Sequence, residues 1–210
     1  MLDRITIRQE EPNDFYQTEH MTQRAFWNKH QPGCDEHYLV HKLRSDSSYL
    51  PEISRIAVIN EAVVGCIMYS KARVEDGENQ YEVATFGPLC VDPDFQGRRI
   101  GEKLVAETLK LAAAAGIPGI IIYGEPDYYP RQGFRTCDHF NITTPEGENF
   151  DAFMGYEIKK NGFENIRGKF YLSEVFHHLP ESEIINFNKR FPQMNLIKGG
   201  SEQCLRRNLR

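Results

Sequence analysis

The sequence predicts an α+β domain whose sheet is mixed, mostly antiparallel, and built around one central crossover. Three strand-like runs follow one another without a helix between them, at residues 54–59, 62–70 and 81–91. The third run leads into an amphipathic stretch at residues 100–115 and then into a short apolar run, rich in β-branched residues, at 119–123. A strand, a helix and a buried strand in this order predict a right-handed crossover between parallel strands.

The first 44 residues predict a strand and two helices. Residues 3–8 alternate between apolar and charged side chains, as a strand does. Pro12 introduces a helix in which Phe15, Met21 and Phe26 recur at near-helical spacing. Residues 36–44 predict a second, short amphipathic helix.

Strand-like character resumes after the crossover and ends before a different C-terminal segment. The predicted strands cover residues 134–140, 153–158 and 169–175. Residues 181–191 predict a helix that stops before a proline, and a polar end follows that carries Arg206, Arg207 and Arg210. We therefore expect a main domain at residues 1–178 and a loosely held extension, a helix plus a basic tail, at residues 179–210.

Composition narrows the class of protein. With 40% hydrophobic and 26% charged residues in 210, the chain has a globular composition, and no apolar run approaches the roughly eighteen residues of a membrane span. The first eleven residues lack the pattern of a signal peptide, so we expect a cytoplasmic protein with no membrane partner. The net charge of −5 disfavours general nucleic-acid binding and suits a cationic amine substrate.

Cysteine and histidine usage predicts neither a disulfide framework nor a metal site. The five cysteines are odd in number and include no Cys-x-x-Cys pair, and the seven histidines form no cluster with metal-ligand spacing. Cys66 and Cys90 lie in apolar strand-like runs, where a free cysteine usually behaves as a small buried hydrophobic residue.

The junction between the third strand and the crossover helix carries the most chemical information. Arg98 and Arg99 stand at the start of the helix, where exposed N–H groups already carry partial positive charge. An anion bound there would remove this conflict, and Gly101 would let the backbone approach it closely. A solvated basic cap with a packing glycine is the other interpretation, and the local sequence favours neither.

The segment from Val91 to Gly101 resembles the coenzyme A pyrophosphate loop of the GNAT acetyltransferases, whose pattern is Arg/Gln-x-x-Gly-x-Gly/Ala. Gln96 and Gly101 match that pattern, whereas Arg99 replaces its middle glycine. The resemblance implies a GNAT fold with a splayed central strand pair, and acetyl-CoA as cosubstrate. It implies that the cofactor is held by Leu89, Cys90, Val91, Gln96, Gly97, Arg98, Arg99, Ile100 and Gly101.

A Gly87-Pro88 pair interrupts the strand that leads into this loop. Proline removes a ladder donor and glycine commonly marks a bulge, so we expect a local break in pairing. The break is either an edge irregularity or, as the resemblance implies, the bulge that frees backbone groups around residues 89–91 for the pantetheine arm and the thioester oxygen. An N–H held at that oxygen would stabilise the tetrahedral transition state.

A second segment, residues 124–134, resembles the GNAT pattern Tyr-x-x-x-Gly-Phe, with Tyr129, Gly133 and Phe134 at the matching places. Its fuller form is similar to a YhbS-like subgroup of predicted acetyltransferases, a likeness that covers roughly residues 3–175. Attack of an amine on a thioester expels a thiolate that needs a proton, and Tyr129 is the candidate general acid. The alternative interpretation is that Tyr128 and Tyr129 are both packing aromatic residues, and it is stronger for Tyr128 than for Tyr129.

No general base is predicted. Some GNAT enzymes carry a glutamate on the splayed strand, but Thr85 stands at that position here. Glu82, Glu125 and Asp127 are near the site along the chain, although surface carboxylates are the usual state of such residues.

These features predict direct transfer of an acetyl group to a primary amine, without a covalent acyl-enzyme and without a metal. One alternative is an acyl-CoA-binding sensor without turnover, which the arginine in the loop and the missing base make conceivable. Another is an adaptor that uses the basic tail, which the net charge disfavours. The acceptor amine, a small molecule or a peptide, the acyl-chain preference, a possible homodimer and the role of residues 179–210 all remain open.

Overall fold

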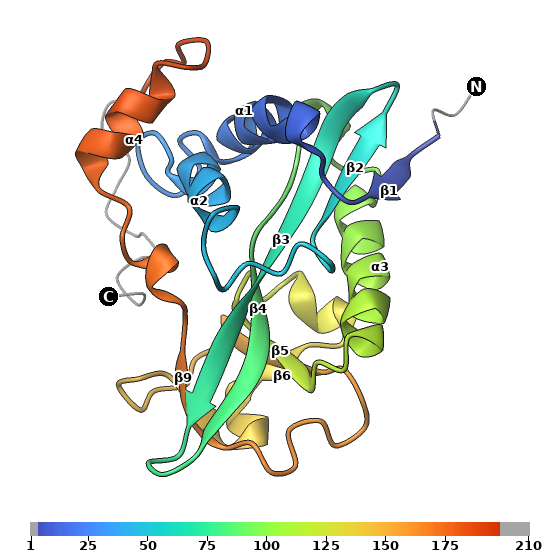
Figure 1. The fold of residues 1–210 in the computed structure, drawn as a ribbon, viewed down its shortest axis with the longest axis vertical. Coiled ribbons are helices and arrows are strands. Elements are labelled where there is room, and N and C mark those ends of the chain that lie inside the picture. Colours follow the sequence, from blue (N-terminus) through green and yellow to red (C-terminus); the bar gives the residue numbers. More distant parts are fainter. Residues whose placement is uncertain (1–3, 198–210) are drawn as a thin grey trace.

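The computed structural model describes residues 4–197, which form one mixed sheet with helices on both faces (Figure 1). The elements in chain order are β1 (Thr6–Arg8), α1 (Phe15–Phe26), α2 (Glu36–Leu43), β2 (Arg55–Ile59), β3 (Ala62–Glu75), β4 (Gln80–Val91), α3 (Ile100–Ala114), β5 (Gly119–Tyr123), β6 (Arg135–Thr136), β7 (Ile142–Thr143), β8 (Phe153–Glu157), β9 (Gly168–Tyr171) and α4 (Glu181–Asn188). Short 3-10 turns precede α1, join β4 to α3, and follow β5, β6 and β9.

The sheet confirms the predicted α+β class and its central crossover. The strand order is β1-β2-β3-β4-β5-β8-β6, and β9 pairs with the distal part of β3 and with β7. Neighbouring strands are antiparallel except β4 with β5 and β7 with β9. The helix α3 connects the parallel strands β4 and β5, as a crossover requires.

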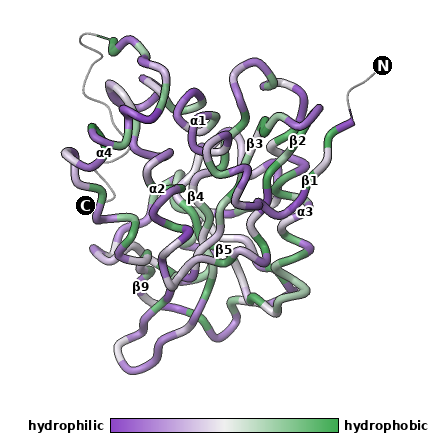
Figure 2. The backbone as a smooth tube through the Cα atoms, turned by 45° about the horizontal axis from the view of Figure 1, so that its top comes forward, coloured by the Kyte–Doolittle hydropathy of each residue, from purple (hydrophilic) through white to green (hydrophobic). Residues whose placement is uncertain are grey.

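Two hydrophobic layers hold the helices to the sheet. The apolar stripe of α3, including Leu104 and Val105, is buried against one face, where Tyr69 of β3 also lies. On the other face, Leu43 of α2 belongs to a second buried cluster together with Met68 of β3. Successive side chains of a strand point to opposite faces, so β3 contributes side chains to both hydrophobic layers. Figure 2 shows the hydrophobic stretches of the chain gathered in these central strands.

The prediction of a strand over residues 134–140 was wrong beyond its first part. Only Arg135–Thr136 pairs with β8, and Cys137–Phe140 forms a 3-10 turn that ends at Asn141 with φ +56°. The ring of Phe134 packs in the layer beneath α3, whereas Phe140 packs on Phe163, with 4.9 Å between ring centroids. Because these two anchors lie in different clusters, the chain turns between them.

Two strand ends also differ from the prediction. β3 continues to Glu75 because its distal half gains β9 as a second neighbour. β9 itself ends at Tyr171, and residues 174–176 form a 3-10 turn, where the predicted strand reached 175.

The predicted loose attachment of the C-terminal extension was also wrong for its described part. Phe187 of α4 and Phe191 after it form a buried cluster with Tyr38 of α2. The predicted basic tail lies outside the described residues, so the tail and the proposed boundary at residue 178 stay predictions. Within residues 4–197, no helix has the length and apolar character that a bilayer crossing requires.

Candidate functional site

The site begins where β4 and β5 separate. The two strands share a single paired position, Ala84 with Ile120, so the last seven residues of β4 have no strand neighbour on that side. Between the pairs Tyr69–Phe86 and Ile67–Leu89, β4 also has one residue more than β3. This bulge lies at Gly87 and Pro88, where the sequence predicts a break in pairing. The splayed strand pair is therefore present, and its backbone groups face an opening between strands.

A cavity of about 560 Å³ occupies this opening. Its walls come from the end of β4, the following loop, the start of α3, the segment after β5 and the last part of α1. The lining residues are Ala25, Phe26, Lys29, Leu89, Cys90, Val91, Phe95, Gln96, Gly97, Arg99, Ile100, Gly101, Glu102, Glu125, Tyr128 and Tyr129. Eight of the nine predicted cofactor-binding residues line this one cavity. The exception is Arg98, whose guanidinium lies 4.9 Å from the centroid of the Phe95 ring.

The loop between β4 and α3 uses two residues with positive φ. Gly97 has φ +74°, and Arg99, at the cap of α3, has φ +58° and ψ +25°. A left-handed conformation costs a non-glycine residue about 1–2 kcal/mol. Arg99 thus adopts a backbone conformation that a glycine, the usual residue of this pattern, would adopt without that cost. The Gln96 side chain closes the loop by donating from Nε2 to the Val91 carbonyl at 3.1 Å.

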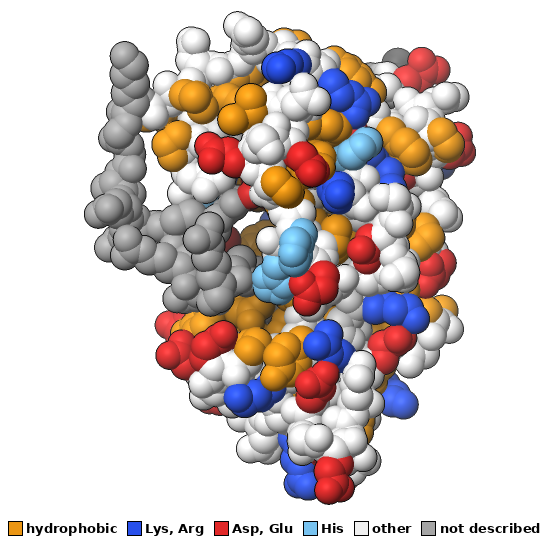
Figure 3. All heavy atoms as spheres, turned by 60° about the vertical axis from the view of Figure 1, so that its left-hand side comes forward, with side chains coloured by type: hydrophobic (Ala, Val, Ile, Leu, Met, Phe, Trp, Pro, Cys, Tyr) orange, Lys and Arg blue, Asp and Glu red, His pale blue; other side chains and the backbone are white. Residues whose placement is uncertain are grey.

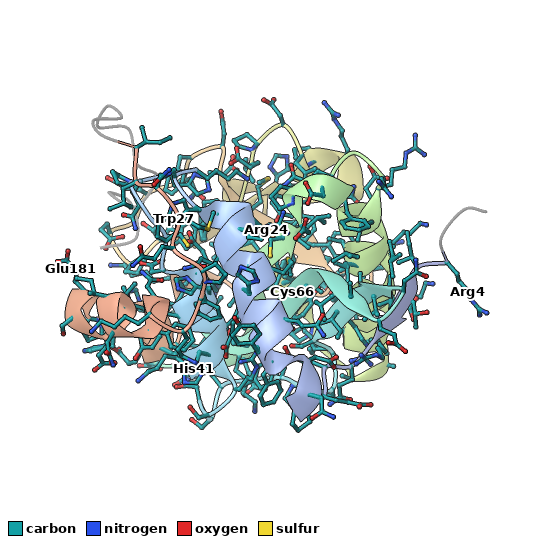
Figure 4. All side chains as sticks on the ribbon, turned by 90° about the horizontal axis from the view of Figure 1, so that it is seen from above. Arg4, Arg24, Trp27, His41, Cys66 and Glu181 are labelled. Carbon is teal, nitrogen blue, oxygen red and sulfur yellow. The ribbon has the colours of Figure 1, made fainter. Side chains whose placement is uncertain are left out.

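Arg24 ties α1 to the start of this loop, a contact that the sequence did not reveal. Its Nη1 lies 3.0 Å from Oδ2 of Asp92, and its Nη2 lies 2.8 Å from Oδ2 of Asp94. Asp92 is buried, and its Oδ1 also accepts from the N–H of Asp94 at 3.0 Å. Figure 4 shows Arg24 and Trp27 on opposite sides of the end of α1. The only sequence signal would have been an arginine in the last turn of a helix and two aspartates in a loop 70 residues later.

Tyr129 lines the cavity, although its side chain is almost fully buried. It is 9% exposed, and its ring packs on Phe86, Phe134 and Tyr128 with centroid distances of 5.8, 5.4 and 5.0 Å. Gly124 makes room for this ring, because a Cβ there would lie 2.3 Å from Tyr129 Cε2. Burial, with a smaller effect from Tyr128, raises the pKa of Tyr129 above its ordinary value. The phenol is therefore protonated throughout the neutral pH range.

Tyr128 has a different place from Tyr129 and is the less buried of the two, although the sequence analysis gave it the stronger packing interpretation. It is half-buried and reaches back over the first turn of α3. A Cβ added to Gly101 would lie 2.9 Å from Tyr128 Oη. Glycine at this position therefore leaves space between the helix start and the phenol, and both residues line the cavity.

The cysteine side chains at the splay are packed thiols. Cys66 of β3 and Cys90 of β4 are direct cross-strand partners, with 3.5 Å between their sulfur atoms. Thr22 of α1 lies against both sulfurs, at 3.5 and 3.6 Å. Burial raises the pKa of the Cys90 thiol, so it is not a thiolate at neutral pH. This arrangement confirms the buried, hydrophobic role predicted for both residues.

The three carboxylates considered as bases occupy different places. Glu125 lines the cavity beside Tyr129, and so does Glu102 of the first turn of α3, which the sequence analysis did not consider. Glu82 lies in another hollow, of about 380 Å³, where Lys71 Nζ is 3.1 Å from its Oε2. Asp127 lines neither hollow.

Comparison with known families agrees with this geometry. The model of the acetyltransferase (GNAT) family matches residues 7–134, which is more than half of the chain. The chain belongs to the GNAT acetyltransferase family. The matched region contains the splay, the loop, α3 and the Tyr129 segment, so both motifs lie inside the shared GNAT domain.

Two GNAT relatives from Escherichia coli share part of the sequence. The uncharacterized N-acetyltransferase YjhQ of strain K12 is 29% identical over 99 residues, which are 47% of this chain and 55% of YjhQ. The chain thus spans about half the length of that relative. The uncharacterized N-acetyltransferase YhbS of the same strain is 25% identical over 140 residues, which are 66% of this chain and 81% of YhbS. The YhbS-like subgroup suggested by the sequence is confirmed.

Solved structures share the GNAT fold. The crystal structure of YhbS from Escherichia coli in complex with CoA has a TM-score of 0.75 and 24% identity, covering 86% of this chain and 96% of that one. A GNAT family acetyltransferase from Brucella melitensis in complex with acetyl-CoA has a TM-score of 0.66 and 24% identity, covering 83% of this chain and 99% of that one. Both likenesses confirm the predicted fold.

Proposed function

We propose that the protein binds acetyl-CoA in the cavity between β4 and α3 and transfers the acetyl group directly to a primary amine. The observation that carries this proposal is that one cavity unites a strand edge without a neighbour, a helix N-terminus and a buried tyrosine. The complexes of YhbS with CoA and of the Brucella protein with acetyl-CoA support the choice of cofactor.

The loop and the start of α3 would hold the diphosphate. Backbone N–H groups at a helix N-terminus bind anions, and the left-handed residues Gly97 and Arg99 shape the loop around that point. The Arg99 side chain adds a positive charge that a glycine would not supply. The free edge of β4 at residues 89–91 would bind the pantetheine arm and the thioester carbonyl.

Tyr129 would act as the hydrogen-bond donor and proton source for the departing sulfur. At ordinary pKa values, near 10 for tyrosine and 8.5 for a thiol, complete transfer to a free thiolate is uphill by about 2 kcal/mol. Burial raises the pKa of Tyr129 further, but the same dry surroundings also raise the pKa of a thiol bound there. A hydrogen bond to sulfur that strengthens as the C–S bond breaks is therefore the expected role.

The acceptor must lose a proton before or during attack, and of the three carboxylates considered from the sequence Glu125 is the best placed to receive it. Among the three candidates from the sequence, it is the one that lines the cavity with Tyr129. Cys90 would form no acyl-enzyme, because its thiol is buried against Cys66 and its pKa is raised. Direct transfer to the amine is the remaining route for the family's chemistry.

The test is release of free CoA thiol from acetyl-CoA across a panel of amines, some with and some without a carboxylate. Direct CoA binding is measured in parallel for the wild type, Tyr129→Phe and Glu125→Gln. We expect Tyr129→Phe to lose about tenfold or more in kcat while its CoA affinity changes less than about twofold. Glu125→Gln should lose more activity at neutral pH, where the amine is protonated, than at a pH near the ordinary amine pKa of about 10.4, where much of the amine is free. CoA binding without turnover of any amine would favour the alternative of an acyl-CoA sensor. If the wild-type protein does not bind CoA, the proposal is overturned.

A further inference from the structure

Besides the buried cluster of Phe187 and Phe191 with Tyr38, an amide side chain anchors the C-terminal extension to the N-terminal helices. α4 lies beside α2 (Figure 1), and Figure 3, which brings the left-hand side of that view forward, shows histidine side chains next to acidic and basic ones on this face. At the end of α4, Asn188 Oδ1 accepts from Gln23 Nε2 of α1 at 3.0 Å. His37 Nε2 of α2 lies 2.6 Å from the same oxygen. Asn188 therefore joins three helices.

The hydrogen-bond pattern assigns the tautomer of His37. Because Asn188 Oδ1 is an acceptor, His37 Nε2 must carry the hydrogen, which leaves Nδ1 as an acceptor. Cys34 Sγ lies 3.4 Å from that Nδ1 and also donates to the Gln23 carbonyl oxygen at 3.7 Å. His37 is fully buried, and the ring is neutral in this arrangement. The chain of bonds thus runs from α4 through His37 to the residues that begin α2.

A second anchor lies further along the extension. The backbone carbonyl of Asn195 accepts from Trp27 Nε1 and from Asn28 Nδ2, both at 2.9 Å. Trp27 and Asn28 follow the last residue of α1 directly. The extension thus holds the end of α1 and the start of the next loop at two points.

The same stretch of chain forms one wall of the cavity. Residues 25, 26 and 29 line the cavity, whereas residues 23, 27 and 28 bind the extension. The two sets are interleaved over residues 23–29, so a shift of the second set moves the first. The position of this wall therefore depends on residues 188–195.

This wall is the part of the cavity that the cofactor elements do not supply. The residues predicted to hold acetyl-CoA come from β4, its loop and α3, and the loop is closed by its own hydrogen bond from Gln96 to the Val91 carbonyl, besides the contact that Arg24 of α1 makes with its start. The wall from α1 carries an aromatic ring at Phe26 and a cation at Lys29, with 5.7 Å between that ring's centroid and Lys29 Nζ. It faces the same opening in which the thioester would lie.

We propose that residues 181–197 are a positioning element for the amine acceptor, and that Asn188 is its central residue. The proposal rests on the proposed acetyltransferase function. Asn188 touches no reacting atom and acts through Gln23 and His37 on the wall at residues 25–29. Loss of its amide oxygen should therefore weaken acceptor binding and leave acetyl-CoA binding intact.

The first experiment compares Asn188→Leu, Asn188→Asp and Ile185→Ser, with the most active amine of the panel. Leucine is similar in size but accepts no hydrogen bond, and we expect it to raise KM for the amine at least about fivefold while KM for acetyl-CoA and kcat change less than about twofold. Aspartate keeps an acceptor oxygen for both donors and should restore the amine KM. Ile185, on the same helix and 56% exposed, is the control that should change nothing.

The second experiment is independent of turnover. Hydrogen exchange of residues 27–34 should be faster in Asn188→Leu than in the wild type and unchanged in Ile185→Ser. If Asn188→Leu does not fold, Gln23→Met carries both tests, because it removes one of the two donors and fills the same buried space. An unchanged amine KM in a folded variant, or unchanged exchange where no amine is turned over, overturns the inference. Absence of turnover by the wild type alone counts against the proposed function only.

Discussion

Acidification should unfold this protein partly through a single buried histidine. His37 is 0% exposed, and burial lowers its pKa from the ordinary 6.5 to about 4. Between these two pH values the unfolded chain binds a proton that the folded protein excludes, so the free energy of unfolding decreases as pH falls. The contribution of His37 is complete above pH about 6.5 and is lost progressively down to pH about 4.

The size of the effect follows from the difference in pKa. At 1.36 kcal/mol per pKa unit, the difference corresponds to roughly 3 kcal/mol when the loss is complete, and to about 2 kcal/mol at pH 5. Urea denaturation at pH about 7.5 and 5.0 measures it, and the single tryptophan, Trp27, provides the fluorescence signal beside the extension. The wild type should lose about 2 kcal/mol more than His37→Gln between the two pH values.

The control separates titration of His37 from general loosening of the extension. Phe187→Leu weakens the ring contact with His37, whose centroids are 5.5 Å apart, without removing the titrating group. Its stability should be lower at both pH values but should fall with pH as steeply as that of the wild type. If the wild type and His37→Gln lose the same stability between pH 7.5 and 5.0, the assignment of the acid sensitivity to His37 is refuted.

Two further substitutions test the site. Gly124→Ala places a Cβ 2.3 Å from the Tyr129 ring, so the ring must shift by about 1 Å. We expect kcat to fall by roughly 10–100-fold at unchanged CoA affinity. If Gly124→Ala lowers kcat further in the Tyr129→Phe background, the effect does not act through the Tyr129 hydroxyl. Arg99→Gly relieves the left-handed strain and should be about 0.5–1 kcal/mol more stable in urea than Arg99→Ala, while both bind CoA several-fold more weakly than the wild type. Equal stability of the two variants would show that backbone strain at residue 99 is unimportant. A CoA affinity equal to that of the wild type would show that the charge of Arg99 does not contribute to binding.

Most of the fold near the site could be predicted from the sequence because its signals are local. The crossover at residues 81–123 is encoded by a change from strand to helix periodicity and back, and its helix and last strand were predicted to within one residue. The Gly87-Pro88 break predicted the bulge, because neither residue supports a regular ladder. The two motifs place the loop and Tyr129 through spacing alone, and the cavity brings them together.

The strand predicted at residues 134–140 shows where this reasoning fails. Its aromatic and β-branched residues are typical of a strand, but Phe134 and Phe140 belong to different hydrophobic clusters, and packing overrides local preference. The base could not be chosen from the sequence for the same reason. Glu82 and Glu125 are both near the motifs along the chain, and only the fold separates them into two hollows.

The sequence by itself determined the family, the crossover and the residues of the cofactor loop, because spacing along one short segment is enough to specify them. Only the tertiary structure decided what surrounds them. Arg24 meets Asp94 across 70 positions, and Gln23 meets Asn188 across 165. Each of these contacts requires a polar group to find a partner on another element, and for the buried Gln23 an unpaired group would be costly. No periodic pattern in the sequence predicts which partner a polar group contacts, so only the folded structure shows that the extension is attached to the wall of the site.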